Sequence, residues 1–444
     1  MCLTEAHAGS DLGMLRSKAV PAADGSFRLT GSKIFISGGE QDLTENIVHL
    51  VLARLPDAPP GSKGISLFLV PKFLPDGDGD KLGARNAVHC TGIEHKMGIR
   101  GSATCSMQFD AASGWLIGAA NRGLAAMFVM MNAARLHVGL QGLGIAETAY
   151  QNSLAYARER LQSKAPGRPP GSKEAADAIV LHPAVQRLLM TQRVHVEGGR
   201  MLAYWTGLML DRAEHDADPA TRQALQQQVS LVTPIVKAML TEHGFQGASL
   251  ALQVFGGHGF ITETGIEQAL RDVRVTLIYE GSNEIQAIDL LLRKVLADGG
   301  ARLEHLLAGI EDTAQMEAAG PLARHAATLL ELLRRTRDAT RAVAQAAAVQ
   351  PAVAYRIAPE MLRLVGHCAL AWLWLRAARA ALRLHARDPV FHAAKQASAC
   401  YYFDYVLPEV QQLLGVIDAC LRGSADGAHA AFPSDLSDYA QEAT

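Results

Sequence analysis

Residues 279–286 read Tyr-Glu-Gly-Ser-Asn-Glu-Ile-Gln, and they place one carboxylate, that of Glu280, directly before a glycine. Gly281 lets the backbone approach a bound ligand closely, because glycine has no side chain. Ser282 and Asn283 favour the start of a helix at this point. The pattern therefore predicts an acidic side chain presented at a junction, where it could act on a bound molecule.

The residues before Glu280 complete this picture. We expect residues 273–279 to form a strand that leads into the junction. A carboxyl group there, partly removed from water, would have a raised pKa and could accept a proton from carbon. The ordinary alternative is a surface carboxylate that stabilises the N-terminus of the helix. Spacing alone favours this alternative.

A second segment, residues 253–260, reads Gln-Val-Phe-Gly-Gly-His-Gly-Phe. Gly256 and Gly257 permit close backbone approach, and their amides could bind a pyrophosphate. The alternative is a simple glycine turn between helices. The segment is not a dinucleotide-binding fingerprint, because no GxGxxG follows a predicted strand here.

Composition excludes several other classes. The 42 Lys and Arg residues nearly balance the 44 Asp and Glu residues, so no strong field attracts nucleic acid. Six cysteines without a CxxC pair argue against a zinc site and a disulfide framework, and indicate the cytoplasm. We expect no signal peptide and no transmembrane segment, because no uninterrupted apolar run approaches about 18 residues. Serine-hydrolase, P-loop and zinc-protease motifs are also lacking, and we expect no metal site.

The first part of the chain, up to about residue 115, predicts β-structure. Strands are expected at 27–36, 47–53, 64–71 and 103–109, where β-branched and aromatic residues are bounded by Gly and Pro. Short strands with frequent turns are typical of an antiparallel barrel or sandwich.

From residue 123 onward the apolar period is helical. Long helices at about 183–214 and 220–250 predict an up–down bundle with short connections. The chain is rich in Ala, Leu and Arg after residue 300, and Pro351 and Pro389 divide it into at least three helices.

These elements predict an α+β protein. We expect an antiparallel β-barrel or sandwich domain at 1–117, a helical bundle domain at 118–298 and an extra C-terminal helical domain at 299–444.

A third segment, residues 4–11, reads Thr-Glu-Ala-His-Ala-Gly-Ser-Asp. In order and rough spacing, the three segments resemble the motifs of the acyl-CoA dehydrogenase family. Residues 279–286 match the family's Tyr-Glu-Gly-Thr/Ser-x-x-Ile-Gln, and residues 4–11 match its flavin loop, with Ala6 where proline is usual. The resemblance covers about residues 1–295. The region after it is similar to the long bacterial branch that includes 3-methylmercaptopropionyl-CoA dehydrogenase.

The resemblance implies FAD-dependent α,β-dehydrogenation of an acyl-CoA. Glu280 would abstract the α-proton, and N5 of FAD would accept the β-hydride. The backbone N–H of Glu280 would help to polarise the thioester carbonyl. The family also implies a homo-oligomer and an electron-transferring flavoprotein as electron acceptor.

The same resemblance assigns further residues. Thr4 would face the flavin, Ser10 the CoA side, and Arg160 the FAD phosphates, for which a guanidinium is well suited. In the family, the segment matched by residues 253–260 contacts the FAD of a neighbouring subunit. The implied cofactor contacts are Thr4, Ser10, Phe35, Ile36, Ser37, Arg160, Gln162, His182, Gln253, Gly256, Gly257, Gly281, Ser282 and Glu284. The implied substrate contacts are Ser10, Arg135, Glu280 and Gly281.

Two alternatives remain open at this level. An acyl-CoA oxidase would perform the same proton and hydride steps with oxygen as acceptor. Family members begin with a helical domain that precedes the β-domain, whereas this sequence begins at the flavin loop. We therefore expect a misplaced start or a truncation, and the alternative to an enzyme is a truncated, non-catalytic helical assembly protein.

Overall fold

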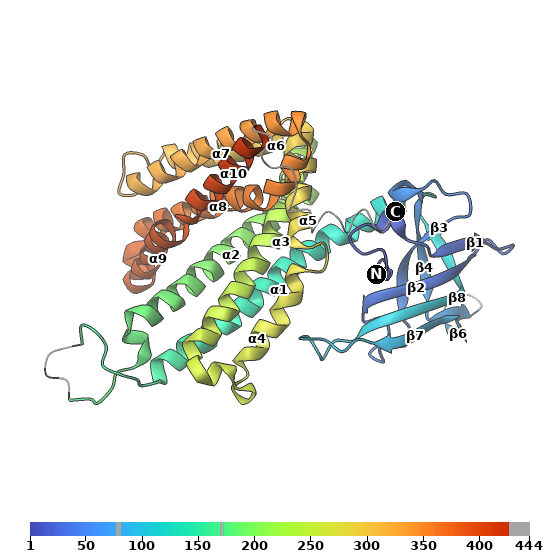
Figure 1. Ribbon diagram of the computed structural model, residues 1–444, viewed down its shortest axis with the longest axis horizontal. Coiled ribbons are helices and arrows are strands. Elements are labelled where there is room, and N and C mark those ends of the chain that lie inside the picture. The colour runs from blue at the N-terminus through green and yellow to red at the C-terminus, as the bar shows by residue number, and fades with distance from the viewer. Residues whose placement is uncertain (77–80, 169–170, 172, 426–444) are drawn as a thin grey trace. The chain divides into compact units, whose positions relative to one another are not determined.

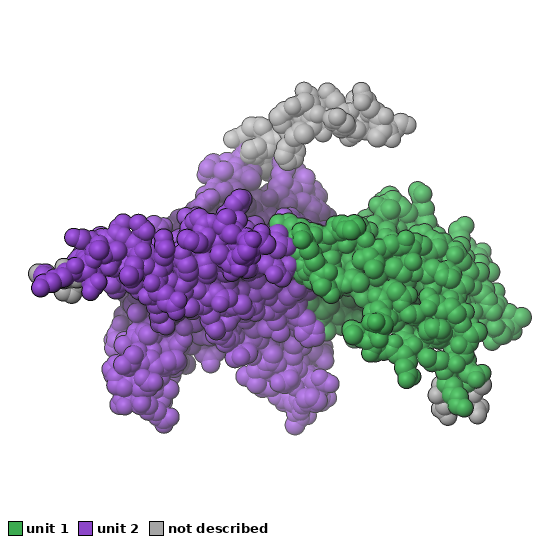
Figure 2. Space-filling model, turned by 90° about the horizontal axis from the view of Figure 1, so that it is seen from below, with its two compact units in different colours: residues 1–134 green, residues 135–444 purple. Residues whose placement is uncertain are grey.

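The computed structural model describes residues 1–76, 81–168, 171 and 173–425. The chain divides into two compact units, residues 1–134 (unit 1) and 135–444 (unit 2), which Figure 2 shows in different colours. Each unit has its own core, and we describe each by itself. The division into three domains at 117/118 and 298/299 stays a prediction.

Unit 1 contains a small β-barrel (Figure 1). The sheet order is β2-β1-β3-β4-β8-β7, and β2 also pairs with β8, so the sheet closes on itself. All its pairings are antiparallel except that of β1 with β3, which is parallel. The strands are β1 Lys18–Pro21, β2 Phe27–Ser37, β3 Val48–Arg54, β4 Ile65–Pro71, β5 Phe73–Asp76, β6 Lys81–Arg85, β7 Val88–Ile93 and β8 Thr104–Ile117.

The barrel interior explains which strands could be predicted. Leu29, Phe68 and Phe109 are buried in its core, and they come from long strands in which buried and less buried residues alternate. The predicted strands at 27–36, 47–53, 64–71 and 103–109 are confirmed as β2, β3, β4 and β8. The other strands are short, and β5 and β6 bury no residue that the structure describes, so they lack an alternating signal.

Unit 2 is helical. Helix α1 begins in unit 1 and continues into unit 2. In Figure 1, α1, α2 and α3 run side by side, and α7, α8 and α10 lie together. The helices are α1 Gly123–Glu159, α2 Pro183–His215, α3 Pro219–Phe255, α4 Ile266–Val273, α5 Asn283–Ile288, α6 Ala301–Gln315, α7 Ala323–Val349, α8 Ala352–Leu384, α9 Pro389–Tyr401 and α10 Glu409–Ala425.

Sequence signals account for the helix ends. Asp218 accepts hydrogen bonds from the first amides of α3, and Pro219 occupies the first helical position, where its missing N–H costs nothing. Pro351 and Pro389 mark the starts of α8 and α9, as expected. Most of α8 is buried, because α2, α3, α7 and α10 pack around it. A helix whose apolar residues lie on all of its faces is stable in water only when other elements cover those faces.

One prediction about this unit is wrong. Residues 273–279 form no strand: α4 ends at Val273, a 3-10 turn (η6, Arg274–Leu277) follows, and the chain then enters the Glu280 turn. A short run of β-branched and aromatic residues can form either a strand or a buried helical turn, so its composition does not distinguish the two. Here the segment packs against α3, and this packing favours the helical turn.

Among the described helices, α1 is long and apolar enough to cross a membrane by length and composition. The core helices of globular proteins share this length and composition. Polar residues, Arg135 among them, interrupt its apolar run.

Candidate active site

The backbone at Glu280 has an unusual conformation. Glu280 has φ 54° and Gly281 has φ 83°, so two consecutive residues are left-handed between η6 and α5. Glycine tolerates this conformation, but a glutamate does so at a cost, and such residues cluster at functional sites. The turn presents a carboxylate at the start of a helix, as the sequence predicted.

A buried amide holds this turn in place. Gln286, which is fully buried, donates hydrogen bonds from Nε2 to the carbonyl oxygens of Glu280 and Gly281, each at 3.2 Å. A Cβ atom at Gly281 would lie 2.7 Å from that same Nε2. Ser282 caps α5, because its hydroxyl accepts from the N–H of Ile285 at 3.4 Å. The motif's glycine, serine and glutamine therefore each support the shape of the turn.

Buried cations surround the turn within unit 2. Arg135 on α1 is 5% exposed, and its Nη1 lies 3.3 Å from Oδ2 of Asp289. Lys237 on α3 is fully buried and donates from Nζ to Oδ1 of Asn283 at 2.9 Å. Burial raises the pKa of Glu280, and the positive charges of Arg135 and Lys237 oppose this rise. The carboxylate is thus a stronger base than an ordinary glutamate.

A second group of predicted residues lies where α1 and α3 end. Tyr156 stacks on Phe255 with ring centroids 4.2 Å apart, and its hydroxyl lies 3.4 Å from Nδ1 of His258. This contact joins the end of α1 to the glycine segment. Gln253, Gly256 and Gly257 are all exposed there.

Arg160, Gln162 and His182 belong to this second group as well. The carbonyl of Arg160 accepts from the N–H of Ile179 at 2.8 Å, and the N–H of Gln162 donates to Asp177 at 3.0 Å. His182 follows this pairing, and its buried Nε2 has no hydrogen-bond partner among the described residues. Arg160 and Gln162 are exposed and available to a ligand.

The two groups are far apart on one chain. Arg135 and Tyr156 both lie on α1, twenty-one residues apart, which corresponds to about 30 Å of helix. The structure therefore brings the predicted residues of unit 2 together as two separate clusters.

In unit 1, the predicted residues lie on the N-terminal loop and on β2. The carbonyl of Thr4 accepts from the N–H of Ile34 at 2.9 Å, which fixes the loop against the strand. Phe35 has φ 59° and is 62% exposed, beside an irregularity in the pairing of β2 with β8. Ser10 and Ser37 are exposed. Ile36, in contrast, is buried in the barrel core, which leaves its backbone for a ligand.

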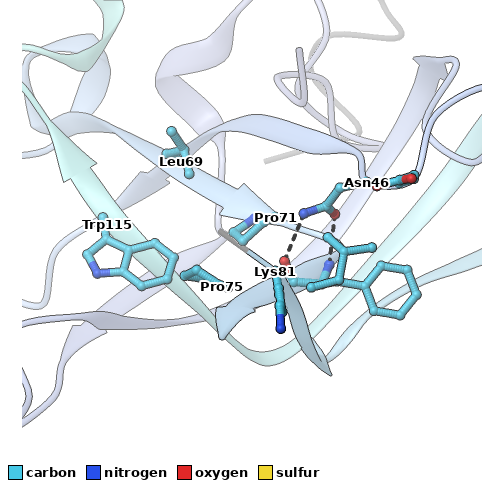
Figure 3. A pocket seen from close by; sticks show the side chains of 9 residues that line it. Asn46, Leu69, Pro71, Pro75, Lys81 and Trp115 are labelled. Carbon is cyan, nitrogen blue, oxygen red and sulfur yellow. Dashed lines mark hydrogen bonds between the residues drawn. The ribbon is translucent and has the colours of Figure 1, made fainter. Parts of the chain in front are cut away.

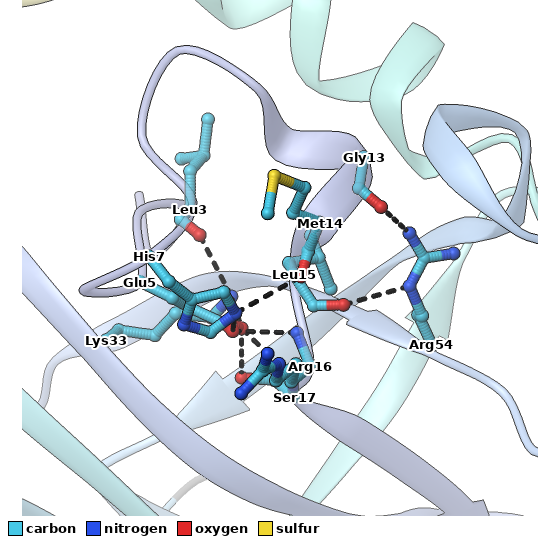
Figure 4. A network of polar contacts seen from close by, with 10 residues as sticks. All are labelled: Leu3, Glu5, His7, Gly13, Met14, Leu15, Arg16, Ser17, Lys33 and Arg54. Carbon is cyan, nitrogen blue, oxygen red and sulfur yellow. Dashed lines mark hydrogen bonds and ion pairs between the residues drawn. The ribbon is translucent and has the colours of Figure 1, made fainter. Parts of the chain in front are cut away.

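Sequence reasoning missed a polar network beneath this loop (Figure 4). Glu5 accepts hydrogen bonds from Arg16 N at 2.7 Å, Ser17 Oγ at 2.6 Å and Lys33 Nζ at 2.9 Å. Lys33 also donates to the carbonyl of Leu3 at 2.9 Å. Although burial acts in the opposite direction, Lys33 and these hydrogen bonds lower the pKa of Glu5 to about 2. The signal in the sequence was a lysine at an inward position of an otherwise apolar strand pattern.

Arg54 completes this network. Its Nε donates to the carbonyl of Leu15 at 2.9 Å, and its Nη2 donates to the carbonyls of Gly13 and Gly61. One guanidinium thus ties β3 to two loops of unit 1, as Figure 4 shows in part.

Unit 1 also has an open pocket of about 550 Å³, next to β4, β5 and the end of β8 (Figure 3). None of the predicted site residues lines it. Asn46, at its edge, is already engaged: its side chain bonds the N–H and the carbonyl of Phe73 at 2.9 and 3.0 Å. Among the described residues, no His, Cys, Asp or Glu cluster is suited to hold a metal ion.

Comparisons with known proteins agree with the motifs. Residues 1–112 match the family model "Acyl-CoA dehydrogenase, middle domain", and residues 121–296 match "Acyl-CoA dehydrogenase, C-terminal domain". Residues 306–423 match "Acetyl-CoA dehydrogenase C-terminal like". The matched regions cover the barrel, the bundle and the C-terminal helices.

Curated relatives support the same family, and a solved structure supports the fold. The chain is 45% identical to 3-methylmercaptopropionyl-CoA dehydrogenase of Ruegeria pomeroyi, over 92% of this chain and 69% of the relative. It is 36% identical to the broad-specificity linear acyl-CoA dehydrogenase FadE5 of Mycobacterium tuberculosis, over 94% of this chain and 71% of the relative. A structure of an acyl-CoA dehydrogenase complexed with FAD from Bacillus anthracis matches with a TM-score of 0.73 at 21% identity, covering 97% of this chain and 69% of that one.

These findings confirm the predicted α+β fold and the resemblance to the long bacterial branch. The chain belongs to the acyl-CoA dehydrogenase family and is an oxidoreductase of that kind.

Proposed function

We propose that this protein dehydrogenates an acyl-CoA thioester between its α and β carbons, with Glu280 as the base and FAD as the cofactor. The observation that carries the proposal is the Glu280 turn. It holds a half-buried carboxylate of raised pKa in a strained, left-handed conformation beside buried cations.

The chain's own groups suit proton removal from carbon. Among the described residues, nothing donates a hydrogen bond to the carboxylate of Glu280, and nothing accepts one from its N–H. The carboxylate is therefore free to take the α-proton. The N–H is free to bind the thioester oxygen, on which negative charge develops as that proton leaves. We assign Arg135, Gly281 and Ser10 to the same substrate.

The residues present fit FAD. When bound, this cofactor supplies a two-electron acceptor for the hydride that leaves the β carbon. In unit 1, Phe35 offers an exposed aromatic ring in a left-handed conformation, and we assign Thr4, Ser10, Ser37 and the backbone of Ile36 to the same cofactor. In unit 2 we assign Gly281, Ser282 and Glu284, which surround the start of α5.

The second cluster of unit 2 fits a phosphate-bearing ligand. Cβ atoms built at Gly256 and Gly257 would meet none of the described atoms within 4 Å, so the backbone there is open. His182 offers a buried ring nitrogen without a partner among the described residues. Because this cluster lies about 30 Å from Arg135, we propose that Arg160, Gln162, His182, Gln253, Gly256 and Gly257 hold the FAD of a second copy. This supports a homo-oligomer.

We propose an electron-transferring flavoprotein as the electron acceptor and a cytoplasmic location. An acyl-CoA oxidase would differ only in its use of oxygen, and the formation of hydrogen peroxide when the purified protein receives an acyl-CoA in air would identify it.

The decisive experiment is the Glu280→Gln variant of the purified protein. We expect the parent protein to be yellow and to reduce an artificial acceptor when an acyl-CoA is added. Glu280→Gln should keep its flavin and lose turnover, because an amide is no base. The control is Glu263→Gln, which changes an exposed glutamate and should behave like the parent. A Glu280→Gln variant with near-normal rates would remove Glu280 from the role of base.

The same preparation tests whether this chain is an enzyme at all. A protein that emerges from gentle purification without flavin, and takes up none when FAD is added, would favour a helical assembly protein instead.

A further inference from the structure

Lys237 is a buried lysine that has no acidic ion-pair partner in the part of the chain that the structure describes. It lies within α3, its exposed fraction is 0%, and among the described residues it takes part in no ion pair. A buried ammonium normally pairs with a carboxylate, because its desolvation is costly. Here its hydrogen bond goes to a neutral group, Oδ1 of Asn283, at 2.9 Å. A feature this costly calls for a role beyond packing.

The partner of Lys237 stands at the start of the helix that follows the base. Asn283 is the first residue of α5, two residues after Gly281. Its Oδ1 also accepts from Thr241 Oγ1 at 3.2 Å, and its Nδ2 lies 3.4 Å from Oε2 of Glu242. Its Nδ2 also lies 3.5 Å from the carbonyl oxygen of Ala238, so one side chain ties the first turn of α5 to four residues of α3. The Glu280 turn lies directly before this anchored point.

The contact between Lys237 and Asn283 adds to the hydrogen bonds of Gln286. Gln286 holds the carbonyls of Glu280 and Gly281 from one helical turn further along α5. Lys237 holds the start of α5 from α3. A left-handed glutamate persists only where its surroundings fix it, and these two contacts fix Glu280 and the residues that directly follow it.

Lys237 also places a positive charge near the base. The charges of Glu284, Arg135 and Glu280 act on the ammonium of Lys237, and the effect of Glu284 is the largest of the three. Glu242 contacts the side chain of Asn283, to which Lys237 also bonds. Burial lowers the pKa of Lys237 to about 8, so the amine is still protonated near neutral pH. Its charge in turn favours the ionised form of Glu280.

We propose that Lys237 is a positioning residue for Glu280. Through Asn283 it fixes the start of α5 and with it the left-handed turn, and its buried charge acts on the carboxylate across that turn. The inference rests on the proposed function, because it assumes that Glu280 is the base.

Three variants test the inference in the full-length, flavin-loaded protein. Lys237→Met removes both the tether and the charge at similar size. Asn283→Ala removes the tether and leaves the charge. Thr233→Val is the control, because it removes a buried polar group from the same helix. The hydroxyl of Thr233 bonds α3 itself at 2.8 Å and does not reach Asn283.

Each variant has its own expected result. Lys237→Met should lower kcat by about 10- to 100-fold, with a smaller change in KM and unchanged flavin content, because a small displacement of the base is expensive. The acid limb of its kcat/KM profile should move to higher pH, because a positive charge near Glu280 is lost. Asn283→Ala should lower kcat without moving that limb. Thr233→Val should match the parent.

The outcomes separate this inference from the proposed function. A folded Lys237→Met protein with the parent's kcat and pH profile would overturn the role of Lys237, even if Glu280→Gln is inactive. An active Glu280→Gln protein would instead overturn the proposed function, and this inference with it. Should Lys237→Met fail to fold, Asn283→Ala decides: a parental kcat in that variant rejects the tether.

Discussion

The two units each bury a lysine completely, but they treat it differently. In unit 1, Lys33 contacts the carboxylate of Glu5 at 2.9 Å and the carbonyl of Leu3, within the network of Figure 4. In unit 2, Lys237 contacts the neutral amide of Asn283. The first charge is paired within its own network, and the second is not.

The acidic residues differ in the same way. Four hydrogen bonds from Arg16, Ser17 and Lys33 converge on Glu5, and its pKa falls to about 2. The carboxylate of Glu280 receives none from the described residues, and burial raises its pKa. A satisfied buried pair fixes a loop, whereas a carboxylate left without donors keeps its capacity to bind a proton. The contrast predicts a structural role for Glu5 and a reactive role for Glu280.

The largest expected effect tests that distinction through activity. Glu280→Gln should lower turnover by about 10³-fold or more, the range expected when a positioned base is removed. Glu5→Gln should leave the turnover of the folded fraction within a few-fold of the parent. Rates per bound flavin, measured with an acyl-CoA and an artificial acceptor, give the comparison. Equal losses in both variants would show that the two acids do not differ in role.

The second-largest effect concerns stability, and here the substitution of Glu5 should matter more than that of Glu280. Glu5→Gln should lower the free energy of unfolding by about 3–5 kcal/mol, because it leaves the fully buried charge of Lys33 unpaired. Urea unfolding measures this, with Glu45→Gln, at an exposed site, as the control. The double variant with Lys33→Met should recover part of the loss. A Glu5→Gln protein as stable as the parent would contradict the ion pair's structural role.

These contrasts also show what sequence patterns could predict. The strands β2, β3, β4 and β8 were predictable because their alternation repeats over many residues. The Glu280 turn and the start of α5 were predictable from a local motif, since Gly281 and Ser282 act on residues next to them. Residues 273–279 were not, because their composition suits a strand and a buried turn equally.

Contacts between distant residues escaped prediction. Arg135 was assigned to the site from its place in the family, but its partner Asp289 lies 154 residues away in the chain. Lys237 and Asn283 are 46 residues apart, and no spacing rule joins them. For Ile36, the strand was predicted but the direction of the side chain was not. The closure of the barrel turns this side chain into the core.

A smaller effect concerns the amide that holds the Glu280 turn. Gln286→Met keeps the size of the side chain and removes both hydrogen bonds, so two carbonyls lose their donor. We expect a loss of about 1–3 kcal/mol in the free energy of unfolding. Turnover should fall by about 10-fold, because the base is less well held. Gln246→Met, at an exposed site on α3, is the control, and parental turnover in Gln286→Met would mean that the turn keeps its shape without the amide.

The smallest effect is a difference in pH dependence. The pKa of Glu5 is lowered to about 2, so its stabilisation is complete above the pKa of about 4.3 of a free glutamate and is lost as the pH falls toward 2. The pKa of Glu280 is raised, so its ionised form costs stability near neutral pH, and that cost disappears on acidification. Glu280→Gln should therefore be slightly more stable than the parent near neutral pH, and Glu5→Gln less stable. As the pH falls, the free energy of unfolding of each variant should approach that of the parent, from above for Glu280→Gln and from below for Glu5→Gln. Urea unfolding at several pH values measures both differences. A Glu280→Gln variant that is less stable than the parent near neutral pH would mean that the carboxylate has a stabilising partner, and the contrast between the two acids would then fail.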